Sequence, residues 1–137
     1  KKLSLQNIGK KMKYAYIDGD DIGLRIEKSI LTNNEETLKN INLEVSASIE
    51  MITTYLLKSD VDVIFSGADG IICKSQEIDI TALHAMISSI NGSISFSVGV
   101  GETLTECFLA LRYAKANGKK GTAIFGKDFI WIPQRLI

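Results

Sequence analysis

Cysteine and histidine are scarce in this sequence of 137 residues, which contains two cysteines and one histidine. Cys73 and Cys107 lie in apolar stretches with no partner at CxxC spacing, and His84 alone cannot complete a zinc site with them. We therefore expect buried free thiols in a reducing, cytoplasmic compartment. No apolar run approaches the ~18 residues that a membrane span needs, so we expect no membrane partner.

The sequence also lacks an excess of charge of either sign. Sixteen lysines and arginines balance sixteen aspartates and glutamates, so the formal net charge is +0. A protein that clamps duplex DNA needs a broad basic surface, so we expect no stable duplex partner. Hydrophobic residues make up 45% of the chain and charged residues 23%, which are proportions typical of one globular domain.

Hydrophobic periodicity divides the chain into strands and helices. Residues 1–11 follow neither period, so we expect an extension there and a domain over residues 12–137. Runs of β-branched and aromatic residues predict strands at residues 14–17, 61–65, 71–73, 94–100, 122–125 and 129–132. Apolar residues at helical spacing predict helices at residues 22–30, 38–56, 80–90 and 104–117.

The order of these elements predicts the fold class. With the first two helices treated as one crossover, the order is β-α-β-β-α-β followed by a helix and a hairpin. We therefore expect an α+β fold of the ferredoxin-like type, with an antiparallel sheet, helices on one face and a C-terminal hairpin. In the strand at 94–100, Phe96, Val98 and Val100 alternate with small residues, so another element should lie close against the small face.

Three carboxylates, Asp18, Asp20 and Asp21, follow the first strand. Carboxylate oxygens favour Mg²⁺, and the N–H groups at the start of a helix can hold phosphate. An ordinary helix cap with a solvated acidic turn is the alternative. A calcium EF-hand is excluded because Ile22 and Ser29 stand where oxygen ligands are needed. A dehalogenase-type phosphatase also has D-x-D after a strand, but this chain lacks that fold's second half.

A further carboxylate lies in the predicted central hairpin, at Asp69-Gly70. This dipeptide is a favoured turn in any protein and alone indicates no function. In a β-α-β-β-α-β sheet, however, the first strand and the central hairpin are neighbours, so Asp18 and Asp69 can converge on one cation. Two carboxylates from separate strands are the minimum frame for two-metal phosphoryl transfer.

Lysines gather at the end of the last long helix and in the loop after it, at Lys115, Lys119 and Lys120. Lysines at this end of a helix interact favourably with its dipole in any protein. Lys115, however, falls on an apolar stripe with Leu104, Phe108 and Leu111, where its ammonium must reach water or an anion. A triphosphate would be such an anion.

Several motifs together resemble one superfamily. Residues 16–23 (YIDGDDIG) resemble the first palm motif of the polymerase subunit of type III CRISPR systems, and residues 65–71 (FSGADGI) resemble the GGDEF or GGDD hairpin of palm nucleotide cyclases. Residues 97–100 and 110–119 resemble the tail of the same superfamily. The DGDDIG opening and the small size are most similar to the minimal CRISPR polymerases, stand-alone palm domains associated with antiphage defence.

The resemblance implies a role for each matching residue. It makes Asp18 and Asp69 the catalytic carboxylates that bind Mg²⁺ or Mn²⁺, with the Gly19 carbonyl and Asp20 as further ligands. It places the nucleotide and its triphosphate on Asp21, Ile22, Gly23, Ser66, Gly67, Lys115 and Lys119. A phosphate cradle would explain the glycine at position 23, which costs up to ~1 kcal/mol in a helix.

Two positions depart from the family pattern. Gly70 stands where an acidic residue is usual, and Ile26 stands where diguanylate cyclases carry a guanine-reading asparagine. The resemblance thus implies a Mg²⁺-dependent nucleotidyltransferase that joins nucleoside triphosphates, with ATP expected, into a cyclic di- or oligonucleotide messenger and releases pyrophosphate. Because cyclisation needs two bound triphosphates, we expect a homodimer.

Two alternatives stay open at this point. The first is a degenerate palm that binds a nucleotide and signals through a partner without catalysis, which the glycine at position 70 favours. The second is a ferredoxin-like regulatory module with no nucleotide role.

Overall fold

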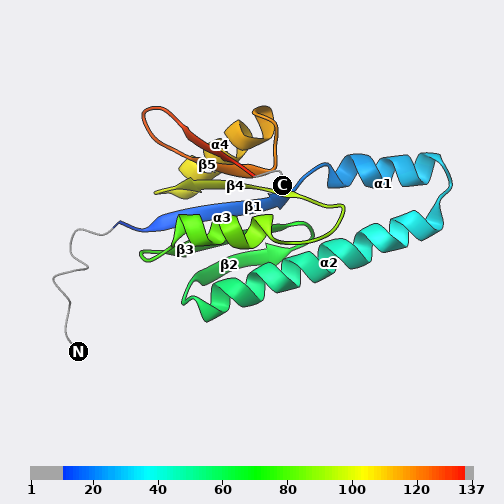
Figure 1. The fold of residues 1–137 in the computed structure, drawn as a ribbon, viewed down its shortest axis with the longest axis horizontal. Helices are drawn as coiled ribbons and strands as arrows, with labels where there is room; N and C mark the ends of the chain where they lie inside the picture. Colours follow the sequence, from blue (N-terminus) through cyan, green and yellow to red (C-terminus); the bar gives the residue numbers. More distant parts are fainter. Residues whose placement is uncertain (1–10, 135–137) are drawn as a thin grey trace.

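The computed structural model describes residues 11–134, and every predicted strand and helix is present in it (Figure 1). The strands are β1 (Lys13–Gly19), β2 (Asp62–Gly67), β3 (Gly70–Ser75), β4 (Phe96–Gly101), β5 (Gly121–Ile124) and β6 (Ile130–Pro133). The helices are α1 (Ile22–Leu31), α2 (Glu35–Lys58), α3 (Ile80–Ser88) and α4 (Leu104–Ala116). The extension expected at residues 1–11 lies outside the described residues except for Lys11.

The strands form one sheet in the order β2-β3-β1-β4-β5-β6. Each of the first four is antiparallel to its neighbours among them, which confirms the ferredoxin-like core. β5 pairs with β4 in parallel because α4 carries the chain back along the sheet between them, so the sheet is mixed rather than antiparallel throughout. β6 then returns antiparallel to β5 as the predicted hairpin.

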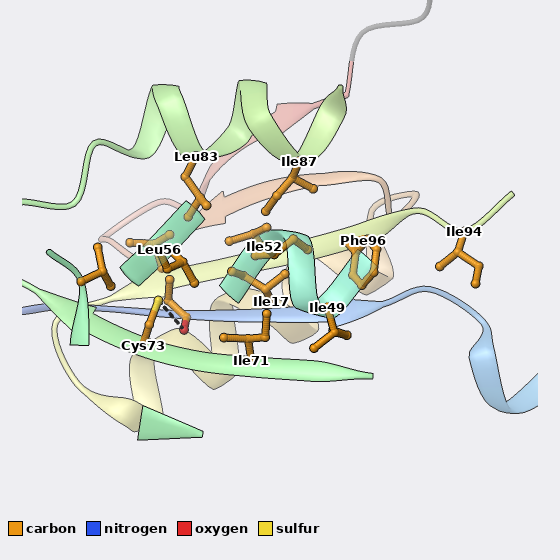
Figure 2. Close-up of a cluster of buried hydrophobic side chains, with 14 of the residues drawn as sticks. Ile17, Ile49, Ile52, Leu56, Ile71, Cys73, Leu83, Ile87, Ile94 and Phe96 are labelled. Atoms are coloured by element: carbon orange, nitrogen blue, oxygen red, sulfur yellow. Dashed lines mark hydrogen bonds between the residues drawn. The ribbon is translucent and has the colours of Figure 1, made fainter. Parts of the chain in front are cut away.

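Helices cover both faces of the sheet, which corrects the expectation of helices on one face. On the first face, α2 and α3 enclose a buried core with Ile17 of β1 and Ile71 of β3 (Figure 2). On the second face, α4 lies directly on β4, where a Cβ at Gly101 would be 2.8 Å from the Cys107 nitrogen. The small residues of β4 are therefore the reason that α4 packs on this side.

The apolar stripe predicted on α4 is wrong in part. Leu111 is buried, but Leu104 and Phe108 are 52% and 44% exposed. The side of α4 that meets the glycines of β4 instead carries small side chains, because larger ones would hold the helix away from the strand. Its buried residues are Cys107, Ala110, Leu111 and Ala114.

The first two helices form a hairpin that extends beyond the sheet (Figure 1). Asn34 caps α2 by accepting a hydrogen bond from the Thr37 nitrogen at 3.0 Å, so this helix begins before the predicted residue 38. The second half of α2 packs on the sheet through residues such as Ile52 and Leu56 (Figure 2). Its first half faces α1 and leaves space between the two helices.

Both cysteines are buried and unpaired, as expected. Burial raises the pKa of Cys73 to about 12, so its thiol is inert at neutral pH. Of the helices within residues 11–134, none combines the length and the apolar character that a membrane crossing requires.

The contact between α4 and β4 can be tested by adding one methyl group. We expect Gly99→Ala to lower the free energy of unfolding by roughly 1–3 kcal/mol in urea denaturation, because the new Cβ overlaps the backbone of Cys107 and Leu111. Gly23→Ala is the matched control, since nothing lies within 4 Å of its Cβ position and alanine favours the helix. A Gly99→Ala protein as stable as the wild type would contradict this packing.

Candidate functional site

The junction between β1 and α1 forms the centre of the site. β1 extends through Asp18 and Gly19, which sequence reasoning placed in a loop. The Gly19 nitrogen donates a hydrogen bond to the Asp69 carbonyl oxygen at 2.9 Å, and the Asp20 nitrogen donates to the Ser95 carbonyl oxygen at 2.9 Å. The junction is therefore fixed between the β2–β3 turn and the segment that precedes β4.

Lys115, in the last turn of α4, joins the residues of this junction. Its ammonium donates hydrogen bonds to Asp20 Oδ1 at 2.8 Å and to the Gly19 carbonyl oxygen at 3.0 Å. It also lies 3.1 Å from Asp18 Oδ2. The structure thus brings together four residues that the sequence proposed for the site.

Asp20 is the most constrained residue of the cluster, with an exposed fraction of 5%. Its carboxylate accepts hydrogen bonds from the hydroxyl groups of Ser95 and Ser97, both at 2.6 Å, and from the Lys120 nitrogen at 3.3 Å. Burial alone would raise the pKa of Asp20, but the hydrogen bonds from Lys115 and the two serines outweigh it and lower the pKa. Asp20 is thereby held inward as a charged residue that positions Lys115.

Asp18 and Asp69, both half-buried, form the negatively charged side of the cluster. Asp69 lies in the two-residue turn between β2 and β3, and its carboxylate is close enough to Asp18 to influence its ionisation. Burial raises the pKa of Asp18, the charges of Asp69 and Asp20 add to this, and Lys115 opposes it. The register places the two residues near each other at this end of the sheet, because Asp18 pairs with Gly70, the residue after Asp69.

The donor set of this cluster suits a hard divalent cation. In the described part of the chain, no three His, Cys, Asp or Glu side chains gather as metal ligands. The oxygen donors at this end of β1 are the carboxylates of Asp18 and Asp69 and the Gly19 carbonyl. Two of these oxygen donors already converge on one positive charge, the ammonium of Lys115. Oxygen ligands and a small number of protein donors are what Mg²⁺ accepts.

The start of α1 is arranged differently from an ordinary capped helix. Asp21 has a left-handed backbone (φ 58°) and makes no capping hydrogen bond with its side chain, which instead pairs with Lys119. The first N–H groups of a helix have no partner inside it, so those of Ile22 and Gly23 have no acceptor within α1. This excludes a side-chain cap as the role of Asp21.

A groove of about 700 Å³ opens between α1 and α2 beside Asp69. Gly23 faces it, since a Cβ there would meet nothing within 4 Å. Sequence reasoning missed two polar residues of α2, Asn42 and Ser46, which lie four residues apart and so share one helix face. The full lining is Ile22, Gly23, Ile26, Leu38, Ile41, Asn42, Val45, Ser46, Ala68 and Asp69.

Ser66 is the predicted site residue that the structure does not bring to the cluster. It pairs with Ile71 in the register, and its hydroxyl group lies 3.0 Å from the hydroxyl of Thr53 on α2. Gly67 does lie beside the cluster, because it pairs with Gly70, which in turn pairs with Asp18. Ser66 therefore fixes the hairpin on α2.

Solved structures of similar fold carry related domains. The GGDEF domain of DgcB from Caulobacter crescentus in complex with c-di-GMP has a TM-score of 0.66 at 13% identity, covering 85% of this chain and 78% of that chain. The active GGEEF domain of a diguanylate cyclase from Vibrio cholerae has a TM-score of 0.66 at 12% identity, covering 90% and 88%. A diguanylate cyclase/phosphodiesterase from Caldicellulosiruptor saccharolyticus has a TM-score of 0.56 at 18% identity, covering 93% and 85%.

These identities establish a shared fold alone, that of a cyclase-like palm domain. No curated protein matches the sequence. The model of the minimal CRISPR polymerase domain (mCpol) matches residues 14–125, which run from the second residue of β1 through β5 and include every residue of the cluster. The chain therefore belongs to the minimal CRISPR polymerase family.

Proposed function

We propose that this palm domain is a Mg²⁺- or Mn²⁺-dependent nucleotidyltransferase that joins nucleoside triphosphates, with ATP preferred, into a cyclic di- or oligonucleotide. A ribose hydroxyl of one nucleotide attacks the α-phosphate of the next, the bond to the β-phosphate breaks, and pyrophosphate leaves. The observation that carries this proposal is the convergence of Asp18, Gly19, Asp69 and Lys115 beside the free start of α1. The product would serve as a messenger in antiphage defence signalling.

The metal would be held by the carboxylates of Asp18 and Asp69 and by the Gly19 carbonyl. A bound divalent cation neutralises charge on the reacting phosphate and lowers the pKa of a coordinated hydroxyl. Sequence reasoning counted Asp20 among the ligands. Its carboxylate would instead position them, because it holds Lys115 and the end of β1 in place.

The triphosphate would lie over the start of α1. The N–H groups of Ile22 and Gly23 point to this end of the helix, where the helix dipole also favours an anion. Lys115 and Lys119, which pair with Asp20 and Asp21, supply positive charge on the other side. Such a clamp binds the substrate and orients its α-phosphate for in-line attack.

The groove between α1 and α2 would receive the base. Its walls are mostly apolar, and Ile26 offers no hydrogen bond to a guanine edge. Asn42 carries an amide in this groove, with an NH2 group that donates and an oxygen that accepts side by side, which suits the edge of adenine. This groove would hold one base per subunit, so two copies facing each other would supply the two triphosphates that cyclisation needs.

A catalytically inactive palm that binds a nucleotide and signals through a partner is the second candidate. Gly70 favours it, because this glycine leaves the cluster one carboxylate short of the family pattern. The two candidates differ in pyrophosphate release, since both predict ATP binding but only the first predicts turnover.

The role of the two carboxylates can be tested by replacing each of them. We expect Asp18→Ala and Asp69→Ala each to lower pyrophosphate release from ATP and Mg²⁺ by roughly 100-fold or more, because few protein ligands hold the metal. Circular dichroism would check that the fold is retained. Asp128→Ala, which removes an exposed carboxylate between β5 and β6, is the matched control. Wild-type turnover in either site variant would contradict the assignment.

Base preference can be tested by competition between equal concentrations of ATP and GTP, with products identified by mass. We expect an adenine product, and we expect Asn42→Ala to reduce the preference for ATP by about tenfold, because a buried polar edge of the base then lacks its partner. A product built only from guanine would overturn the base assignment and leave the metal site standing.

The phosphate clamp makes a separate prediction. We expect Lys115→Ala and Lys119→Ala to raise the KM for ATP and to lower kcat, because the clamp both binds the triphosphate and orients it. Steady-state kinetics of pyrophosphate release measures both constants. Lys127→Ala, at an exposed position between β5 and β6, should match the wild type. Unchanged kcat and KM in both site variants would show that the triphosphate does not bind to these two lysines.

A further inference from the structure

The second face of the sheet is only partly covered. α4 packs mainly on β4, with smaller contacts to β1 and β5. On the remaining part, Phe65 of β2, Ile72 of β3 and Tyr16 of β1 are paired neighbours in the register, and we call them the aromatic row. They face away from the core because the neighbouring Ile71 and Ile17 point into it (Figure 2). Phe65 is 56% exposed, and the other two are half-buried.

α4 forms a wall beside this row. Lys115 contacts the Gly19 carbonyl and so marks the side of α4 that faces β1, and Arg112 and Phe108, three and seven residues before it, lie on the same side by helical spacing. The Arg112 guanidinium lies 5.7 Å from the centre of the Phe108 ring. The wall thus presents an exposed aromatic ring and a cation, one to two turns before the lysine of the site.

The aromatic row lies next to the cluster that contains Asp18 and Asp69. The next row of the sheet contains Gly67, Gly70 and Asp18. A Cβ at Gly70 would lie 3.5 Å from Cε1 of Tyr16, and a Cβ at Gly67 would lie 3.6 Å from Cζ of Phe65. Because both positions are glycines, no side chain there separates the aromatic rings from the carboxylate of Asp18, which the proposed function requires.

We propose that the aromatic row is a stacking platform for the acceptor strand, a short single-stranded adenylate whose terminal hydroxyl attacks the bound nucleotide. This inference rests on the proposed function and adds a second base-binding surface, on the opposite side of the cluster from the groove. Every base has a π-face that stacks on exposed aromatic side chains, and an open sheet face is one of the surfaces that bind single strands in this way.

The charges around the row also suit a nucleic acid strand. Arg112 lies on the wall. Lys74 pairs with Tyr14, which precedes Tyr16 by two residues on β1, so it lies on the side of the aromatic row away from Asp18. Asp62 is paired with Lys74 and reduces this positive charge, so the site is suited to a short strand more than to a long one. Cations placed around aromatic rings suit the phosphates and bases of a strand. They would add little to the binding of a second copy of the chain, whose net charge is +0.

The test uses the linear trinucleotide ApApA, labelled with fluorescein at its 5′ end, and measures fluorescence anisotropy with the whole chain and Mg²⁺. We expect Phe65→Leu to weaken binding about tenfold, because leucine keeps apolar surface but has no π-face. Phe65→Tyr is the matched control and should bind as the wild type does. We expect Arg112→Gln to weaken binding and to reduce its dependence on salt.

The outcomes separate this platform from the proposed function. Binding of an ATP analogue with a methylene bridge between its α- and β-phosphates should be equal in the wild type and in Phe65→Leu, because that nucleotide occupies the groove. Trinucleotide binding that needs Phe65, without pyrophosphate release from ATP, would support the platform and reject catalysis. Pyrophosphate release together with unchanged trinucleotide binding in Phe65→Leu would overturn the platform. Conversion of a dimer to a monomer by Phe65→Leu in sedimentation would also overturn it, because the row would then be an interface.

Discussion

The buried carboxylate of Asp20 is the interaction on which the site depends. A charge that is 5% exposed must be paired and hydrogen-bonded, because an isolated buried charge is strongly unfavourable. Its partners come from three separate parts of the chain, with Ser95 and Ser97 at β4, Lys115 in α4 and the Lys120 nitrogen before β5. Satisfying this one charge therefore fixes the end of β1 relative to β4 and α4.

The packing of α4 explains how Lys115 reaches that charge. Gly99 and Gly101 leave no side chains between α4 and β4, so the two backbones come into direct contact. At this separation the ammonium of Lys115 can contact the Gly19 carbonyl, which a helix held farther out by larger residues would not allow. The small face of β4 is thus a requirement of the site as well as of the fold.

Sequence reasoning predicted the elements and the pair Asp18 and Asp69, because periodicity reports local structure and topology makes the two strand ends neighbours. It did not predict the face on which α4 packs, since periodicity shows that a helix has a buried side but not which surface it meets. It also missed Ser95 and Ser97, because a serine in a strand carries no local signal and its partner Asp20 lies 75 or more residues away. Asn42 was missed because a polar residue on a helix gives no sign in the sequence that a groove lies beside it.

The charge of the cluster gives the departure at Gly70 a physical meaning. Asp18, Asp20 and Asp69 carry a formal charge of three units, and Lys115 neutralises one of them, which leaves the charge that one divalent cation balances. A Cβ at Gly70 would lie 3.2 Å from Asp18 Oδ1, so a carboxylate built there would stand directly against Asp18. Like charges at such short range repel strongly unless further positive charge is bound between them. With glycine at this position the cluster keeps two negative charges, which one divalent cation would balance, whereas an acidic residue there would leave three, one more than such a cation balances.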